Sequence, residues 1–197
     1  MVTAKKFNRA AEDVGNILAM EHVNVTVPDQ ALATSFYVNG LGFTRDPYID
    51  FGSRNVWINV GNQQFHLPTS KAQVLRGHVG VVVPDLDDLE QRLTRLTSVL
   101  KDTRFSFKPS GEAISVTCPW GNQIKCHAPG KFGEMKLGIP YVEFNVPTGT
   151  VAGITRFYEK VFSCRTTLRK SSCEVEVGRG QTLRYKETKT QADYDGH

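Results

Sequence analysis

Two stretches of the chain decide its fold: EHVNVTVPD at residues 21–29 and GHVGVVVPD at residues 77–85. They are identical at six of nine positions. In both, a His is followed by apolar residues at every second position, which is typical of a strand with one buried face. The Pro-Asp pair that closes each stretch indicates a turn, and Asp29 and Asp85 are placed to cap the helices that we expect to follow.

A second pair of similar stretches lies further along the chain, GNQQFHLP at residues 61–68 and GNQIKCHAP at residues 121–129. Each begins with a Gly-Asn-Gln turn, continues as a short strand with one His, and ends at a Pro. Two short strand-like runs separate each predicted helix from its Gly-Asn-Gln turn. The chain therefore contains two β-α-β-β-β units, which we place at residues 19–70 and 75–130.

A third unit begins at residue 138 and runs through IPYVEFNVPTG, a helix and two strands. Tyr141, Tyr185 and His197 lie 119 residues after His22, His66 and His78, respectively. This shared offset indicates a tandem duplication of a two-unit half. The third unit, residues 138–197, ends on the first residue of an expected fourth unit, so we interpret the chain as a piece of a longer protein.

Composition excludes several classes of protein. Hydrophobic residues make up 40% and charged residues 22%, which is typical of a soluble globular chain. No stretch approaches the roughly 18 apolar residues of a membrane helix. The net charge of +4, without long runs of Lys and Arg, gives no support for nucleic-acid binding. Residues 1–18 have apolar positions at helical spacing and predict an N-terminal helical segment.

The four cysteines lack CxxC spacing. Because the N-terminus has no signal peptide, we expect reduced thiols in a cytoplasmic protein.

The repeated units resemble the vicinal oxygen chelate superfamily, which includes glyoxalase I, extradiol dioxygenases and the fosfomycin- and bleomycin-resistance proteins. The stretches that carry the resemblance are EHVNVTVPD, SFYVNGLGF, GNQQFHLP, GHVGVVVPD, PWGNQIKCHAP and RFYEKVF. The resemblance implies an α+β fold in which two β-α-β-β-β units pair into a cupped, eight-stranded mixed sheet. We expect the first two units to form this sheet and the third unit to stay unpaired and to pack apart from them.

All five histidines fall at the first or fourth strand of a unit: His22, His66, His78, His127 and His197. The resemblance implies that these strands converge inside the cup, where glyoxalase-like members bind one divalent metal. We therefore predict that His22, His66, His78 and His127 form a metal site. Imidazole is a suitable ligand for Fe, Zn, Ni or Mn.

Four further residues are candidates for substrate binding: Asn24, Gln64, Lys125 and Trp57. Because side chains alternate along a strand, Asn24 lies on the face of His22, and Gln64 on that of His66. Two features depart from the pattern of the family. His66 and His127 stand where an acidic ligand is usual, and an alignment on Gly121 places Lys125 at that acidic position.

Two functions remain open from the sequence. The first is a metal-dependent enzyme, either a lyase or isomerase or a dioxygenase, that acts on a small oxygenated organic substrate within residues 20–130. Its catalytic residues are unassigned, and Tyr141 at the start of the third unit argues against a standard extradiol dioxygenase. The alternative is a metal-free protein of the bleomycin-resistance type that binds and sequesters a small molecule. We expect a small-molecule partner and a homodimer through the open sheet edge of the third unit, without nucleic acid or membrane.

Overall fold

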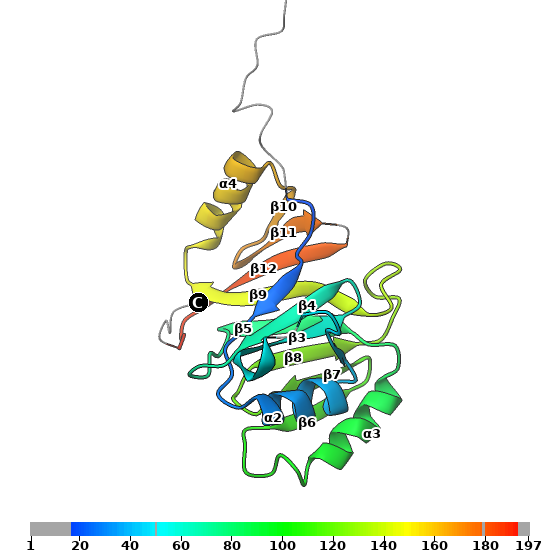
Figure 1. Ribbon diagram of the computed structural model, residues 1–197. Coiled ribbons are helices and arrows are strands. Elements are labelled where there is room, and N and C mark those ends of the chain that lie inside the picture. The colour runs from blue at the N-terminus through cyan, green and yellow to red at the C-terminus, as the bar shows by residue number, and fades with distance from the viewer. Residues whose placement is uncertain (1–16, 50, 179, 193–197) are drawn as a thin grey trace, which may run out of the picture.

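The computed structural model describes residues 17–49, 51–178 and 180–192 (Figure 1). The predicted N-terminal helix falls almost entirely on residues 1–16, which lie outside the described residues, as does His197. None of the helices in the described ranges is long and apolar enough to cross a membrane. The four cysteines are free thiols, as expected from their spacing.

Each unit follows the predicted order of elements. The first contains β1 (His22–Asn24), α2 (Gln30–Thr34), the π-helical η1 (Ser35–Gly40), β2 (Thr44–Arg45), the short 3₁₀ turn η2 (Gly52–Arg54), β3 (Asn55–Val60) and β4 (Gln63–Pro68). The second contains β5 (Gly77–Val82), α3 (Leu86–Leu96), β6 (Ser106–Ser110), β7 (Ala113–Thr117) and β8 (Gln123–His127). The third contains β9 (Gly138–Pro147), α4 (Val151–Phe162), β10 (Thr166–Leu168), β11 (Ser172–Gly178) and β12 (Gln181–Thr188). The α+β class is thus confirmed.

Both predicted N-caps are present. The carboxylate of Asp29 accepts hydrogen bonds from the backbone N–H groups of Ala31 and Leu32, at 2.8 and 2.9 Å. The carboxylate of Asp85 binds Asp87 N and Asp88 N in the same way, at 2.8 and 3.0 Å. Each cap satisfies backbone donors that the first turn of a helix leaves without partners.

The strands form a four-stranded sheet, in the order β1-β4-β3-β2, and an eight-stranded mixed sheet, in the order β10-β11-β12-β9-β5-β8-β7-β6. An eight-stranded sheet is therefore present, but its two halves are the second and third units. They join where β5 pairs with β9 in antiparallel register, with His78 opposite Glu143. The expectation that the third unit stays unpaired is wrong.

Two glycines of β5 explain why the third unit pairs there. A Cβ atom at Gly77 would lie 1.8 Å from the carbonyl oxygen of Glu143, and one at Gly80 would lie 2.2 Å from the ring of Tyr141. Strand β9 can approach β5 closely only because these side chains are absent. The repeat places Glu21 and Asn24 at the corresponding positions of β1, and both of these residues carry side chains.

The first two units share one hydrophobic core. On the four-stranded sheet, the buried side chains of β3 and β4 include Ile58 and Phe65. They belong to the same cluster as Val79 and Val81 of β5 and Ile124 of β8. In Figure 1 the small sheet lies in front of the second unit, with α2 and α3 side by side below.

One glutamine ties the start of the chain to the third unit. The Gln181 side-chain amide donates to the carbonyl oxygens of Met20 and Ile139, both at 3.0 Å. Its Oε1 accepts a hydrogen bond from Met20 N, also at 3.0 Å. Gln181 is only 3% exposed, so these bonds are shielded from water. Met20, two residues before β1, is thus anchored to Gln181, the first residue of β12.

Candidate ligand-binding site

The structure separates the four predicted metal ligands into two pairs. His22 and His66 lie on the four-stranded sheet, on the face opposite its core, whereas His78 and His127 lie on the eight-stranded sheet. Within the described ranges, no group of three or more His, Cys, Asp and Glu side chains is arranged to hold a metal ion. The predicted convergence of all four histidines is therefore wrong. The reason is that the second unit pairs edge to edge with the third unit. The first unit instead packs its sheet against the face of the second unit, through the hydrophobic core that they share.

The first pair is part of an aromatic stack. The rings of His22 and His66 are parallel to within 14°, with their centroids 4.0 Å apart. Trp57 stacks on the other side of His66, at 3.8 Å. Gln64 Oε1 lies 2.9 Å from His66 Nε2, and the Gln64 amide donates to Asn59 at 2.7 Å. Asn24 pairs with His66 in the parallel register, so it lies on the same face and is exposed.

This stack does not suit a metal ion. The lone pairs of two parallel imidazoles point in parallel directions, whereas ligands of one ion must converge on it. Because the amide oxygen of Gln64 can only accept, His66 Nε2 carries the proton and offers no lone pair. Burial, followed by the influence of His22, lowers the pKa of His66. At neutral pH the ring of His66 is therefore uncharged.

The second pair converges on a tyrosine. The hydroxyl oxygen of Tyr141 lies 3.1 Å from His78 Nε2 and 3.1 Å from His127 Nε2. Tyr141 and His127 are both 2% exposed, and the ring of Phe132 lies against both of them, with centroids at 5.7 and 5.1 Å. The guanidinium of Arg184 lies 3.9 Å from the centroid of the Tyr141 ring, within cation–π distance. The phenolic hydroxyl of Tyr141 therefore lies between the two Nε2 atoms, where a metal bound by both histidines would have to lie. These two imidazoles and the protonated phenol do not fit a metal.

The hydrogen bonds around Tyr141 have a preferred direction. The hydroxyl has one hydrogen to donate, so it donates to one imidazole and accepts from the other. His127 Nδ1 is buried without a hydrogen-bond partner in the described part of the chain, so a proton on that atom would be an unsatisfied donor. We therefore assign His127 Nε2–H as the donor to Tyr141, and Tyr141 O–H as the donor to His78 Nε2. His78 then carries its proton on Nδ1, which faces Glu143 Oε1 at 3.7 Å.

The charge states agree with this arrangement. Burial, together with the smaller effects of the nearby cations Lys131, Lys125 and Arg184, lowers the pKa of His127 to about 4. Burial also lowers the pKa of His78, against the opposite effect of the Glu143 carboxylate. The pKa of Tyr141 is raised to about 12, mainly by burial. At neutral pH both imidazoles are uncharged and the phenol keeps its proton.

A pocket of about 330 Å³ opens beside His78. Its walls come from β5, β7, β8 and β9, and include Ser115, Gln123, Lys125, Glu143 and Asn145. The predicted substrate-binding residue Lys125 thus lies beside the second histidine pair, whereas Asn24, Gln64 and Trp57 surround the first. The volume is in the range of small-ligand sites.

Positive charge exceeds negative charge around this pocket. Lys125, Arg184 and Lys186 all act on His78 to lower its pKa, and Glu143 is the one carboxylate that acts in the opposite sense. The strand registers place Arg184 opposite Glu143, and Lys186 opposite Asn145. With the uncharged His78 in its lining, and with Lys125, Arg184 and Lys186 close by, the pocket is surrounded mainly by cations and hydrogen-bond donors.

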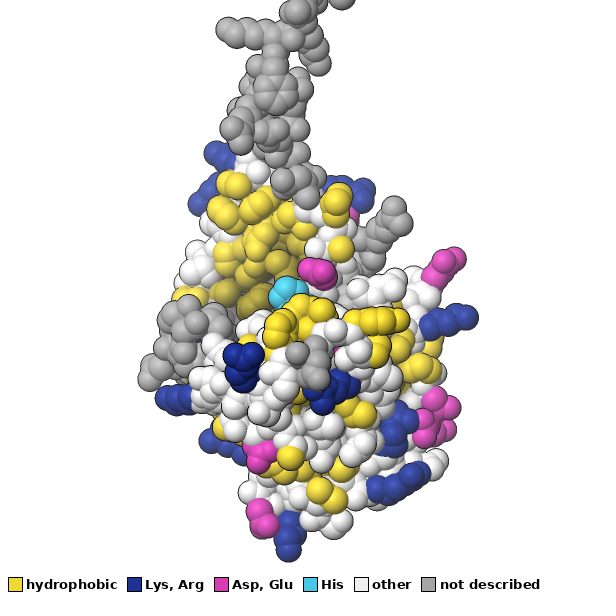
Figure 2. Space-filling view, in the orientation of Figure 1, with side chains coloured by type: hydrophobic (Ala, Val, Ile, Leu, Met, Phe, Trp, Pro, Cys, Tyr) yellow, Lys and Arg dark blue, Asp and Glu magenta, His cyan; other side chains and the backbone are white. Residues whose placement is uncertain are grey.

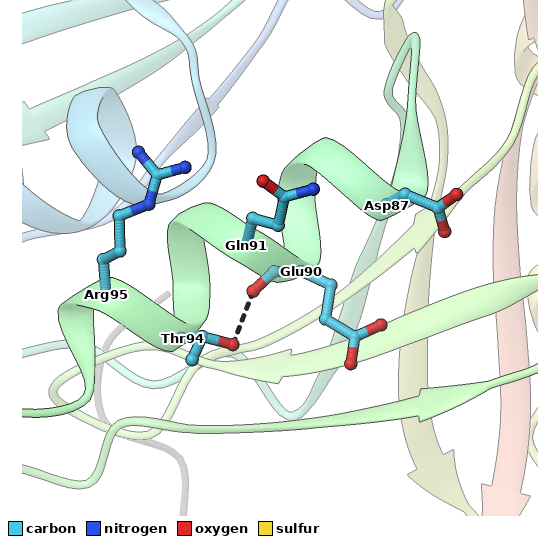
Figure 3. A pocket seen from close by; sticks show the side chains of 5 residues that line it. All are labelled: Asp87, Glu90, Gln91, Thr94 and Arg95. Atoms are coloured by element: carbon cyan, nitrogen blue, oxygen red, sulfur yellow. Dashed lines mark hydrogen bonds between the residues drawn. The ribbon is translucent and has the colours of Figure 1, made fainter.

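Two other hollows are poorer candidates. One is a shallow depression on the solvent face of α3, where Thr94 donates to the backbone oxygen of Glu90 at 2.8 Å (Figure 3). All its side chains project from one exposed helix, so nothing encloses a ligand. A larger groove of about 1020 Å³ lies between residues 18–21, 61–63, 132–137 and 180–181. It follows the junction of the three units, and none of the four histidines that the structure describes lines it.

Sequence reasoning found His78, His127 and Lys125 but missed their partners from the third unit. From the sequence, Tyr141 marks the third unit, 119 residues after His22, and departs from the dioxygenase pattern, but nothing there indicates its contacts with the two histidines. Glu143 is two residues further along the same strand, so period-two alternation places it on the same face. The missing information was that β9 pairs with β5. The expectation of a site within residues 20–130 is corrected accordingly.

Acid should destabilise the protein through His127. Its folded pKa of about 4 lies below the ordinary value of 6.5, so the unfolded chain takes up the proton first as the pH falls. The stabilisation by neutral His127 is complete above about pH 6.5 and is lost towards pH 4, with a slope of up to about 1.4 kcal/mol per pH unit. Urea unfolding at pH 7, 6 and 5 should show a steeper loss of stability for the wild type than for His127→Asn. Equal slopes would contradict this prediction.

Comparisons with known proteins were made for sequence and for fold. Residues 19–99 match the family model described as Glyoxalase/Bleomycin resistance protein/Dioxygenase superfamily. A comparison with curated protein sequences gives no significant match. The fold is similar to glyoxalase I from Zea mays, with a TM-score of 0.61 and 15% identity over 88% of this chain and 69% of that one. It is also similar to a candidate dioxygenase from Bacillus subtilis subsp. subtilis str. 168, with a TM-score of 0.58 and 14% identity over 89% of this chain. The chain spans 66% of the length of that second structure.

Proposed function

Residues 19–99 belong to the glyoxalase/bleomycin resistance protein/dioxygenase superfamily, and from this we propose that the chain binds a small organic anion in the pocket beside His78, without a metal held by its histidines. The observation that carries the proposal is the hydroxyl of Tyr141, 3.1 Å from both His78 Nε2 and His127 Nε2. This hydroxyl engages the Nε2 atom of each imidazole, so neither Nε2 is free to bind a metal. Of the two functions open from the sequence, these contacts favour the metal-free binding protein.

A carboxylate is the ligand class that the pocket fits best. The ammonium of Lys125 and the amides of Gln123 and Asn145 are donors suited to carboxylate oxygens, and a charge-assisted hydrogen bond is stronger than a neutral one. The single carboxylate of Glu143 faces His78 Nδ1–H, so it is partly compensated. A volume of about 330 Å³ lies at the small end of the range for small-ligand sites. Homodimer formation and a cytoplasmic location stay predictions from the sequence.

The proposal is tested by titrating isotopically labelled protein with acetate, oxalate, malonate and phosphate, and following amide shifts by NMR. We expect at least one carboxylate to shift the amides of β5 and β8 at saturable concentrations. Lys125→Gln should weaken this binding at least tenfold, because a hydrogen bond to a charged group contributes about 1.5–3 kcal/mol. Lys101→Gln is the matched control, because this exposed lysine follows α3 and lies outside the pocket.

Metal dependence is tested in the same titration. We expect binding to be unchanged by a chelator and by added Zn²⁺ or Mn²⁺. The proposal fails if the carboxylate binds only after a metal is added and His78→Asn abolishes that metal binding. It also fails if phosphate and all three carboxylates leave the amides of β5 and β8 unshifted.

A further inference from the structure

Two half-buried cations, Lys125 of β8 and Arg184 of β12, lie on the same face of the eight-stranded sheet. Figure 2 shows the molecule from the side of the first unit, where hydrophobic side chains gather over α4 and β10–β12. Because side chains alternate along a strand, the two cations lie on the opposite face of the sheet. The strand registers place them there together with His78 and Tyr141. They therefore belong to the surface that carries the ligand pocket.

Neither cation forms an ion pair with a carboxylate in the part of the chain that the structure describes. Glu143 and Glu174 lie opposite Arg184 on the two neighbouring strands, yet both are beyond ion-pair distance from it. The guanidinium lies instead 3.9 Å from the centroid of the Tyr141 ring. A half-buried charge has lost part of its hydration, so an anion that binds from solution would stabilise both Lys125 and Arg184.

The Tyr141 ring brings the two cations close to each other. The ring covers Gly80, because a Cβ atom at Gly80 would lie 2.2 Å from it. Lys125 lies opposite Gly80 on the neighbouring strand, and the guanidinium of Arg184 lies against the same ring. Since adjacent strands are about 4.8 Å apart, the two charged groups lie within roughly 10 Å of each other. Both also lower the pKa of His78, which agrees with this proximity.

We propose that the ligand of this site is a short dicarboxylate, with one carboxylate on the ammonium of Lys125 and the other on the guanidinium of Arg184. The inference rests on the carboxylate site proposed above and adds a second anchor to it. A guanidinium presents a planar fork of N–H donors, which matches a carboxylate through two parallel hydrogen bonds. Each charged contact takes up about 2.8 Å, so roughly 4 Å remain between the two carboxylates, which about two or three methylene groups bridge. Succinate and glutarate are the simplest ligands of this kind.

The test compares acetate, oxalate, succinate and glutarate on the full chain, by NMR titration of the amides of β5 and β8. We expect succinate or glutarate to bind at least tenfold more tightly than acetate, because a second charge-assisted hydrogen bond forms. Arg184→Gln should remove this advantage and leave the affinity for acetate unchanged, whereas Lys125→Gln should weaken the binding of all four. Oxalate is too short to reach both cations, so its affinity should not respond to Arg184→Gln.

Arg169→Gln is the matched control, because this exposed arginine lies in the turn between β10 and β11, outside the pocket, and its loss should change none of the four affinities. The comparison of ligands on the wild type needs no variant, so it decides the inference even if Arg184→Gln does not fold. The inference alone is overturned if succinate and glutarate bind no more tightly than acetate. The same holds if Arg184→Gln weakens acetate, oxalate and glutarate equally or leaves glutarate unaffected. If none of the four carboxylates binds, the proposed carboxylate site fails together with the inference.

Discussion

Gly77→Ala should lower the free energy of unfolding by more than 3 kcal/mol, the range in which a backbone clash cannot relax. The added Cβ would lie 1.8 Å from the carbonyl oxygen of Glu143 and 2.7 Å from its carbonyl carbon. Both are backbone atoms of β9, so no rotamer change relieves the contact. The strands β5 and β9 must move apart, and their pairing is the hydrogen-bonded link between the second and third units. Chemical denaturation should show the loss, and hydrogen exchange should show faster exchange in β9.

Gly111→Ala is the control for this prediction. Gly111 also has a positive φ, +60°, but a Cβ atom there has no neighbour within 4 Å. The backbone strain should therefore cost about 1–2 kcal/mol and no strand should separate. If Gly77→Ala costs no more than Gly111→Ala, the close approach of β5 and β9 is not what joins the two units.

Phe36→Ala should lower the free energy of unfolding by about 3–5 kcal/mol, the usual cost of removing a buried phenylalanine. Its ring is fully buried in the core that the first two units share, 5.0 Å from the ring of Tyr37. The cavity would open between two helices that belong to different units. Urea unfolding followed by tryptophan fluorescence measures the effect, because Trp57 and Trp120 lie in the first and second units.

The chain contains its own matched control for Phe36→Ala. Phe157 has the same position in the Phe-Tyr motif of the third unit but is 51% exposed. Phe157→Ala should therefore cost less than about 1 kcal/mol in dilute, monomeric protein. Similar losses for the two variants would mean that the burial of the first helix by the second unit does not stabilise the fold.

Much of the architecture could be predicted because it depends on local patterns. The alternation of apolar residues in EHVNVTVPD and GHVGVVVPD produces β1 and β5, and the following Asp residues cap α2 and α3 as expected. The same alternation correctly placed Asn24 on the face of His22, and Gln64 on the face of His66. Within one unit, side-chain direction follows from strand period alone.

The pairing of the units depends on backbone approach, which hydrophobic patterns do not describe. The three units have similar first strands. What distinguishes the second unit is that it has Gly77 and Gly80 where the first unit has Glu21 and Asn24, so only its first strand lets β9 approach closely. The wrong prediction of which units pair also made the predicted metal site wrong, because histidines on different units come together only if those units pair. His78 and His127 belong to one unit and were brought together, whereas His22 and His66 were not joined to them.

The bonds of Gln181 also constrain the order in which the molecule can be assembled. Gln181 holds the backbone of Met20, from which it is separated by 161 residues. Closing so long a loop is slow and comes late, because its entropy must be lost before the contact forms. During synthesis the first residues of the chain leave the ribosome early. The hydrogen bonds between Met20 and Gln181 can nevertheless form only after β12 has been synthesised. The segment before β1 therefore becomes fixed only after almost the whole described chain has been made.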